Sequence, residues 1–337
     1  MTGQLREVAR HVVAVRPVPA DPGVALRAGI SVLVPLLTVL ALDHPAWALY
    51  AAFGAFTSLY GRTRVHLSRL AMQASAGTAL TASVVAGALV GVLDARAWVA
   101  VGVAALIAAG GSALATTQDW HPPGPLFLVF AFGAASSVPH QLSDVPVAAA
   151  VAAASAVFAL VVGNTVGLVR AEPTRPTAPR PVPRWQPVRA AVAVVVAGLT
   201  ATAVGIGHPY WAMVAAVAPL SAPGVTHQVA RAGQRVIGTL AGLLTAAVLL
   251  APGFSAVTTV LVVVVLQVVT ELLIGRNYAI ALLFITPMAL LMGQVAAPRP
   301  MGPLLFDRGV ETVIGAALGL LVIWVGTVLR RRGQQPA

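Results

Sequence analysis

The sequence predicts an all-α, polytopic membrane protein of about 12 transmembrane helices, arranged as two parallel six-helix repeats. Three observations predict this fold: the composition, the recurrence of apolar runs, and two motifs that each occur twice. Of the 337 residues, 58% are hydrophobic and 9% are charged, against about 25% charged in a soluble domain. Apolar runs recur along the whole chain, near the length of about 20 residues that crosses a bilayer.

The repeated motifs favour a duplicated unit. The pattern H-P-x-W-A occurs at residues 44–48 and again at 208–212, a spacing of 164 residues. The pattern H-x6-Q-x3-G-T begins at His66 and again at His227, a spacing of 161 residues. Two independent patterns at almost one spacing are difficult to obtain by chance, so we expect the two halves of the chain to share one architecture.

The first half begins with an N-terminal segment, residues 1–23. Apolar residues at helical spacing predict a short helix on the cytoplasmic face, with a disordered tail as the alternative. The segment lacks a long apolar run, so a cleaved signal peptide is not expected. The first membrane repeat, residues 24–169, contains six predicted spans: 24–42, 46–60, 68–93, 97–116, 124–138 and 147–169.

Residues 170–186 are rich in Pro and Arg and predict a stiff cytoplasmic linker. The second membrane repeat, residues 187–332, follows this linker, and residues 333–337 form a C-terminal tail. The second repeat contains six predicted spans: 187–206, 209–222, 236–251, 255–274, 278–296 and 309–329. The predicted spans also contain four G-x-x-x-G pairs, which favour close helix packing: Gly87/Gly91, Gly163/Gly167, Gly238/Gly242 and Gly315/Gly319.

The distribution of charge predicts the orientation. With a cytoplasmic N-terminus, 18 of the 21 basic residues, all of them Arg, fall on the inner side. Only Arg96, Arg299 and Arg308 fall outside. Positive charge is enriched in cytoplasmic loops, so we expect a multi-pass protein of the plasma membrane with both termini cytoplasmic. An even number of spans in each half makes the repeats parallel.

The composition also excludes several classes of function. The chain has no Cys, which removes disulfides, thiolate nucleophiles and Cys-bound metals. It also lacks G-x-S-x-G, H-E-x-x-H and Walker motifs. We therefore expect no enzyme, no metal site and no cofactor. The arginines are not gathered on one soluble module, so no nucleic acid partner is expected; the expected partner at this point is the lipid bilayer. Homo-oligomerisation is left open.

Two short predicted spans, 46–60 and 209–222, occupy matching places in the two halves. Short or Pro-interrupted spans at corresponding positions often mark transporter sites. Their ends carry Trp47, Tyr210 and Trp211. These residues are equally typical of an interfacial aromatic belt, and a belt residue at a pore mouth can also stack on a planar substrate.

Polar residues follow each short span. The set His66, Gln73 and Gly77 shares one helical face, as does the set His227, Gln234 and Gly238. We expect these two polar stripes to face each other across the interface between the halves. Arginines at the inner end would make this interface a cationic vestibule that concentrates anions.

Two later features carry polar groups inside predicted spans. Arg308 and Glu311 lie one turn apart in the last span. This spacing favours an internal ion pair and a functional site equally. Pro287 interrupts the eleventh span after Thr286, so a carbonyl freed there needs another partner.

Several motifs of the second half resemble the fusaric acid resistance protein family of membrane transporters. They are Tyr210-Trp211, the pattern R-x2-G-T-x2-G from Arg235, the run Arg276 to Ala279, Thr286-Pro287, and the pattern R-x3-T-x2-G from Arg308. The first half matches weakly, through H-P-x-W-A and Gly77-Thr78. The resemblance implies efflux of aromatic or other organic acids. The first half has Ala156 and Ala159 where the second has Arg308 and Glu311, so a charged site would be asymmetric.

The sequence therefore predicts an inner-membrane exporter of organic, above all aromatic carboxylic, anions, with the substrate moving between the two repeats. A passive anion channel and a non-transporting scaffold of envelope assembly are the alternatives. The predicted substrate path comprises Trp47, Arg62, Arg64, His66, Gln73, Tyr210, Trp211, His227, Arg231, Gln234, Arg235, Gly238, Thr239, Arg276, Tyr278, Thr286, Arg308, Glu311 and Thr312.

Overall fold

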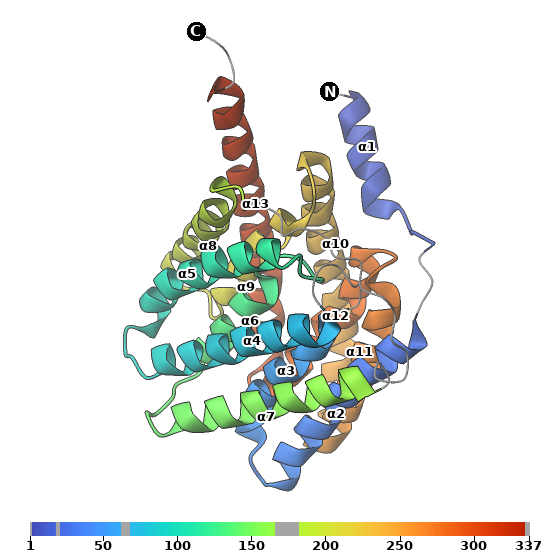
Figure 1. The fold of residues 1–337 in the computed structure, drawn as a ribbon, viewed down its shortest axis with the longest axis vertical. Coiled ribbons are helices and arrows are strands. Elements are labelled where there is room, and N and C mark those ends of the chain that lie inside the picture. The colour runs from blue at the N-terminus through green and yellow to red at the C-terminus, as the bar shows by residue number, and fades with distance from the viewer. Residues whose placement is uncertain (1, 18–20, 62–67, 166–181, 334–337) are drawn as a thin grey trace.

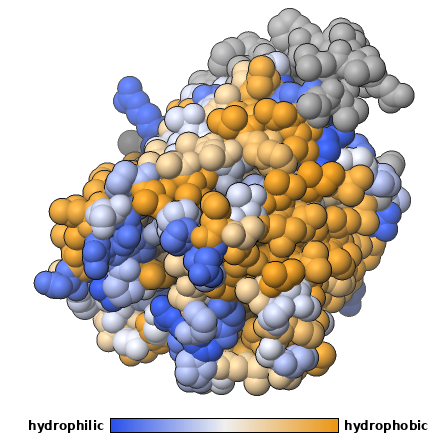
Figure 2. All heavy atoms as spheres, turned by 90° about the horizontal axis from the view of Figure 1, so that it is seen from below, coloured by the Kyte–Doolittle hydropathy of each residue, from blue (hydrophilic) through white to orange (hydrophobic). Residues whose placement is uncertain are grey.

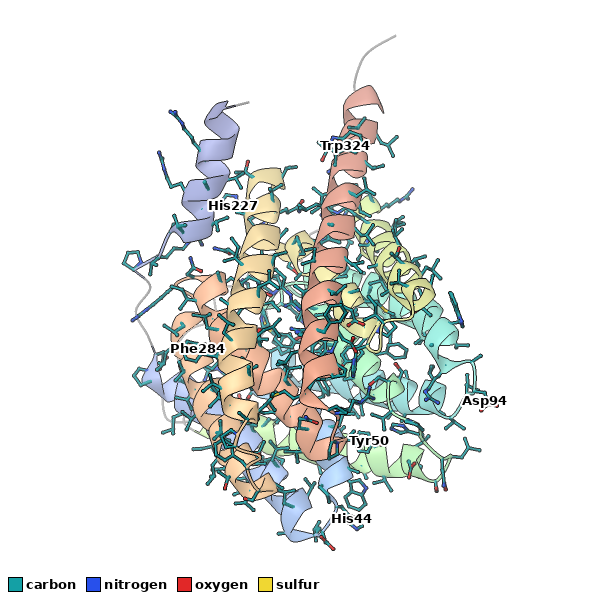
Figure 3. The ribbon with its side chains drawn as sticks, turned by 180° about the vertical axis from the view of Figure 1, so that it is seen from behind. His44, Tyr50, Asp94, His227, Phe284 and Trp324 are labelled. Carbon is teal, nitrogen blue, oxygen red and sulfur yellow. The ribbon has the colours of Figure 1, made fainter. Side chains whose placement is uncertain are left out.

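The structure is a computed structural model that describes residues 2–17, 21–61, 68–165 and 182–333. Within these ranges the chain is all-helical, as predicted, and contains no strand. The helix α1 (Thr2–Val13) and the end of α13 (Met301–Gly333) lie at the same end of the molecule (Figure 1). We call this end the inner end and the opposite end the outer end. His227 and Trp324 lie toward the inner end, and His44 and Tyr50 toward the outer end (Figure 3).

The first half has a helical segment at each of the six predicted positions. The second segment is short and continues at both ends as a 3-10 helix (η). The elements are α2 (Pro22–Ala41), η1 (Pro45–Trp47), α3 (Ala48–Ala55), η2 (Phe56–Leu59), α4 (Arg69–Gly91), α5 (Arg96–Thr117), α6 (Leu126–Ser136) and α7 (Asp144–Thr165).

The second half also has a helical segment at each predicted position. The elements are α8 (Trp185–Val204), α9 (Tyr210–Val217), η3 (Pro219–Ser221), α10 (Val225–Leu250), α11 (Ala256–Leu273), α12 (Tyr278–Ala296) and α13. Three predicted boundaries, in two of the spans, are wrong. The helix α10 starts well before 236, and α13 extends beyond 309–329 at both ends. Buried arginines within these helices are covered by protein rather than lipid, so their charge does not end the helix.

Nine helices of the described chain are long and apolar enough to cross a membrane. The helices α3, α6 and α9 are shorter, so crossing by these three stays a prediction. Large apolar side chains point outward from the long helices; Leu244 is 73% exposed and Val248 is 71% exposed. Hydrophobic residues cover a broad face of the molecule (Figure 2), as expected of a surface that contacts hydrocarbon. The protein is therefore a multi-pass, membrane-embedded protein.

Helix packing follows the same order in the two halves. In the first half α4 packs on α6 and α7, and α3 packs on α7. In the second half α10 packs on α12 and α13, and α9 packs on α13. Contacts of α5 with α8 and of α11 with α2 join the halves, while α4, α5 and α7 run across the direction of α10 and α13 (Figure 1).

Glycine lets the short helix α9 lie directly against α13. A Cβ atom on Gly315 would overlap the carbonyl oxygen of Ala212, and one on Gly319 would lie 2.7 Å from the carbonyl oxygen of Ala216. A Cβ on Gly238 or Gly242 would likewise lie 2.6 Å from a carbonyl oxygen of α12. The close packing predicted from these two G-x-x-x-G pairs is confirmed.

Gly315→Ala is expected to destabilise the protein by about 1–3 kcal/mol, because the added methyl forces α9 away from α13. The matched control is Gly102→Ala on α5, where a Cβ would meet nothing within 4 Å. There alanine should be neutral or slightly stabilising, since alanine favours helix over glycine by about 1 kcal/mol. Thermal unfolding in detergent compares the two variants. Equal midpoints would show that the contact between α9 and α13 is not tight.

The N-terminal segment forms a helix, as predicted, and α1 packs along α10. The side chain of Gln234 donates to the carbonyl oxygens of His11 (3.1 Å) and Val12 (3.2 Å). Asn277 also donates to the carbonyl oxygen of Val12 (3.0 Å), and its own side-chain oxygen caps α12 at the amide of Ala279 (2.8 Å). These bonds hold the first residues of the chain against the inner ends of α10 and α12.

Candidate functional site

A cavity of about 240 Å³ lies between the two halves of the molecule. The first half lines it with α3, η2 and α6, together with residues 121–123. The second half lines it with residues from α9, α10, α11, α12 and α13. The cavity is therefore built at the interface between the halves, where the sequence placed the substrate path.

The first half contributes an aromatic wall. Phe53 and Phe56 of α3 and η2 lie beside Phe130 and Phe127 of α6, and all four line the cavity. The ring centroids of Phe53 and Phe130 are 4.9 Å apart, and those of Phe56 and Phe127 are 5.5 Å apart, both edge to face. Edge-to-face packing fixes the rings, so this wall is rigid and apolar.

The second half contributes three arginines to the cavity lining. Arg235 donates from Nη1 to the hydroxyl oxygen of Tyr278 at 2.7 Å. The guanidinium of Arg231 lies 4.2 Å from the centroid of the same Tyr278 ring. The guanidinium of Arg308 lies 3.7 Å from the centroid of the Trp211 ring. Aromatic faces attract these cations and hold them at the cavity surface.

The arginines retain unused hydrogen-bonding capacity. Arg235 is 3% exposed and Arg308 is 1% exposed. Nε of Arg235, Nε of Arg231, and both Nε and Nη1 of Arg308 are buried without a hydrogen-bond partner. Buried donors are rarely left unpaired, because the loss costs about 1–3 kcal/mol each. These nitrogens are covered by protein atoms, so a carboxylate in the cavity would reach them only if the arginine side chains turned toward it.

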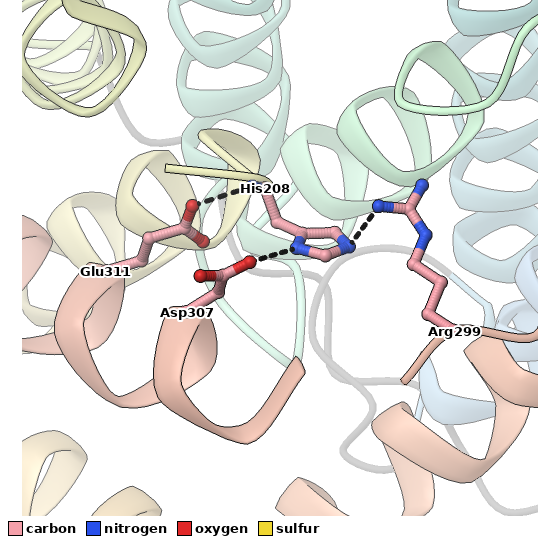
Figure 4. A network of polar contacts seen from close by, with 4 residues as sticks. All are labelled: His208, Arg299, Asp307 and Glu311. Atoms are coloured by element: carbon pink, nitrogen blue, oxygen red, sulfur yellow. Dashed lines mark hydrogen bonds and ion pairs between the residues drawn. The ribbon is translucent and has the colours of Figure 1, made fainter. Parts of the chain in front are cut away.

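Arg308 and Glu311 do not form the internal ion pair that their spacing allowed. Arg308 stacks on Trp211 instead. Glu311 is 0% exposed, and its Oε1 accepts from the backbone amide of His208 at 2.8 Å. The Glu311–His208 bond belongs to a polar network at the outer end, in which His208 also contacts Asp307 and Arg299 (Figure 4).

A smaller pocket of about 50 Å³, the outer pocket, lies between the cavity and this network. His208 and Arg299 line its outer side. Tyr210 and Trp211 line both the outer pocket and the cavity. Leu49, Ala134, Ala289 and Gly293 also line both spaces, so the outer pocket adjoins the cavity on the side of the His208 network.

Six of the predicted path residues meet at the cavity, as the lining shows: Tyr210, Trp211, Arg231, Arg235, Tyr278 and Arg308. Others are buried in helix contacts beside it. Thr312 donates to the carbonyl oxygen of Arg308 (2.8 Å), and Thr239 is 0% exposed. Gly238 and Thr286 pack between α10 and α12. The residues Arg62, Arg64 and His66 lie outside the described residues.

The carbonyl freed by Pro287 finds the partner that the sequence required. Proline has no N–H to donate to the carbonyl of Leu283 one turn earlier. The hydroxyl of Thr245 on α10 donates to that oxygen at 2.9 Å. The expected interruption is wrong, because α12 continues through Pro287. The expected partner for the carbonyl is confirmed, and it comes from a neighbouring helix rather than from a wet cavity.

The two polar stripes do not face each other, so this prediction is wrong. Gln73 stays within the first half, where it donates to the carbonyl oxygen of Tyr60 (3.1 Å) and accepts from Asn164 (2.9 Å). Gln234 turns to α1, and His227 packs edge to face on His11 with centroids 4.6 Å apart. Helical spacing places residues on a common face but does not say which neighbour that face meets.

Two further predicted residues lie away from the cavity lining. Trp47 stacks on His44 at the outer end, with ring centroids 3.8 Å apart, which agrees with the interfacial interpretation. Arg276 contacts the N-terminal segment through its backbone, where its carbonyl oxygen accepts from the amide of Arg16 at 3.0 Å.

Sequence reasoning missed the aromatic wall and the outer network. Phe53, Phe56, Phe127 and Phe130 sit in apolar runs and carry no signal that separates a cavity wall from helix packing. Arg299 did carry a signal, since it is one of the few arginines on the outer side. Among the described residues, no group of three or more His, Asp or Glu side chains is arranged to hold a metal ion.

The family comparison matches the second half of the chain. Residues 192–322 match the family described as fusaric acid resistance protein-like. This part of the chain, less than half of its length, is similar to that family. The region contains every arginine that lines the cavity, together with Trp211 and Tyr278. The fusaric acid resistance protein-like half thus supplies the charge of the site, and the half outside the match supplies the aromatic wall.

One curated relative is itself described as a membrane protein. The chain is 33% identical over 138 residues to the uncharacterized membrane protein YvaC of Bacillus subtilis (strain 168). The similar region covers 40% of this chain and 22% of the Bacillus protein, so the chain spans well under two thirds of that relative. No solved structure matches the chain.

Proposed function

We propose that the protein exports aromatic carboxylate anions, and that the cavity between its halves is the substrate site. The observation that carries the proposal is the pairing of an aromatic wall with three arginines whose buried nitrogens lack partners. An aromatic carboxylate has one apolar face and one anionic end, which match these two groups of residues. A guanidinium also offers a planar fork that suits a carboxylate.

The size of the cavity supports a substrate with one aromatic ring. An apolar cavity of about 150 Å³ in a protein interior can hold benzene. The cavity here is about 240 Å³, so it has room for a ring and a carboxylate. The recurring order of helix packing supports a duplicated unit in which the substrate passes between the two halves.

The charge distribution supports export rather than uptake. The arginines gathered at the inner side concentrate anions there. A membrane potential that is negative inside favours outward movement of an anion by about 2.3 kcal/mol per charge and 100 mV. The fusaric acid resistance protein-like match supports a transporter and gives no support to an enzyme.

Flux of benzoate in proteoliposomes tests the proposal. Uphill benzoate export driven by a pH gradient would support a coupled exporter, whereas ohmic benzoate current would identify a passive anion channel. Benzylamine, which has the same ring and the opposite charge, is the matched control and should not move. Absence of benzoate flux from well-folded protein would favour a non-transporting scaffold.

The proposed orientation places the protein in the plasma membrane with its inner end in the cytoplasm. Cysteines introduced at Asp94 or Pro298 are expected to react with an external, membrane-impermeant thiol reagent in intact cells. A cysteine at Thr177, outside the described residues, should react only after permeabilisation. The chain has no cysteine of its own, so the background is clean. External labelling at Thr177 would reverse the orientation.

A further inference from the structure

His208 and Arg299, which both line the outer pocket, are joined by a hydrogen bond that depends on the charge of the histidine. Nη1 of Arg299 lies 2.8 Å from Nε2 of His208, and Nδ1 of His208 lies 3.3 Å from Oδ2 of Asp307 (Figure 4). A guanidinium can only donate, so Nε2 accepts and the ring proton sits on Nδ1, where it is donated to Asp307. His208 is therefore neutral in this arrangement.

Arg299 is held in place through its backbone. The side chain of Gln294 accepts from the backbone amide of Arg299 at 2.6 Å and donates to its carbonyl oxygen at 2.7 Å. These two bonds fix the start of the side chain, and its guanidinium donates to an uncharged acceptor. A guanidinium binds a carboxylate more strongly than a neutral acceptor, so an arriving anion would compete well with His208.

The outer pocket connects this guanidinium with the cavity. Tyr210 and Trp211 line both spaces, and the ring of Tyr210 lies edge to face with that of His208 at 6.1 Å between centroids. An anion that leaves the cavity past Tyr210 and Trp211 would meet Arg299 next.

We propose that Arg299 is a second anion site at the outer exit of the path, that His208 occupies this site when the exit is closed, and that protonation of His208 frees it for the leaving carboxylate. The identity of the anion rests on the proposed function. The proton comes from the outer solution and binds Nε2. Both partners are then cationic donors, so their bond is lost, while Asp307 gains a charged partner.

Groups from three parts of the fold surround His208: Tyr210 of α9, Arg299 between α12 and α13, and Asp307, Arg308 and Glu311 of α13. Burial and then the charge of Arg299 lower the pKa of His208 below its ordinary value of about 6.5, against the opposing effect of Asp307. The exit bond is therefore intact at neutral pH and is lost as the external pH falls below that value.

Access to a cysteine inside the path tests the gate without any substrate. Ala134 lines both the cavity and the outer pocket, so Ala134→Cys reports whether the exit is open. Asp94→Cys on the outer surface is the reference, because it corrects for the pH dependence of thiol reactivity. We expect the external labelling rate of the first, relative to the second, to rise about tenfold as external pH falls from about 8 to about 5.

Two substitutions of His208 separate the gate from general loosening of the fold. In His208→Gln the amide oxygen still accepts from Arg299 but takes up no proton, so labelling should stay slow at every pH. In His208→Ala the acceptor is gone, so labelling should be fast at every pH. A pH response in His208→Gln equal to that of the parent protein would overturn the gate.

The anion site is tested with the labelling reagents themselves as probes. At low pH a thiol reagent carrying a sulfonate should reach Ala134→Cys about tenfold faster than one carrying a trimethylammonium group. Arg299→Ala should abolish this preference, whereas Arg96→Ala, at another outer arginine, should keep it. An unchanged preference in Arg299→Ala would overturn the anion site. Failure of benzoate export with these labelling results intact would reject the proposed substrate alone.

Discussion

Benzoate export is expected to fall at least tenfold when Arg235 is replaced by alanine. The substitution removes a buried guanidinium that donates to Tyr278 and has a further unpartnered nitrogen at the cavity. A tenfold loss corresponds to about 1.4 kcal/mol in the transport step, which is within the range for a hydrogen bond to a charged group. Initial rates in proteoliposomes, normalised to folded protein, measure the effect.

Two variants distinguish a binding role of Arg235 from simple anchoring of the helix. Arg235→Lys keeps the charge but loses the planar fork, so it should restore little export. Arg184→Ala, at an exposed arginine before α8, should leave export unchanged. Full rescue by lysine would mean that charge alone matters at this position, and normal export by Arg235→Ala would remove Arg235 from the site.

Arg308→Met is expected to lower benzoate export about a hundredfold, or about 2.7 kcal/mol. Arg308 is the most deeply buried of the three arginines that line the cavity, at 1% exposed, and two of its nitrogens have no partner. Methionine fills a similar space without charge, so the loss reports on the cation rather than on packing.

Thermal stability provides the control for Arg308→Met. A buried cation without a paired anion costs free energy of folding, and its replacement by an apolar group is often neutral or stabilising. The unfolding midpoint should therefore stay unchanged or rise while export falls. A fall in both would indicate a structural role, and export near the parent rate would exclude Arg308 from the substrate site.

Much of the fold follows from the sequence, because lipid requires every backbone polar group to be satisfied within a helix. The apolar runs therefore predicted a helical segment at each of the twelve membrane positions. The position of Pro287 correctly predicted that a freed carbonyl would need another partner. The start of α10 was misjudged because Arg231 and Arg235 suggest a solvated turn. Both face protein rather than water, a fact of packing that the local sequence does not contain.

The charged residues of the site could be predicted from the sequence, whereas its apolar residues could not. A buried arginine is costly, so Arg235 and Arg308 stand out in a hydrophobic sequence. Phe53 and Phe130 do not stand out, because phenylalanine in a membrane helix is equally suited to lipid and to a cavity wall. The direction of the Gln73 and Gln234 side chains also depended on neighbours distant in the sequence, among them Asn164 and the N-terminal helix.

The contacts of the N-terminal segment set an order in biosynthesis. Val12 is held by Asn277, a residue 265 positions later in the chain. This bond cannot form until the chain has been translated as far as Asn277, which follows α11 and precedes α12. The residues synthesised first therefore lack this contact until α2 to α11 have been translated, and until then Asn277 does not hold the basic helix α1 beside the growing bundle. The earliest point for this contact is thus after α11 has been synthesised, while α12 and α13 are still to be made.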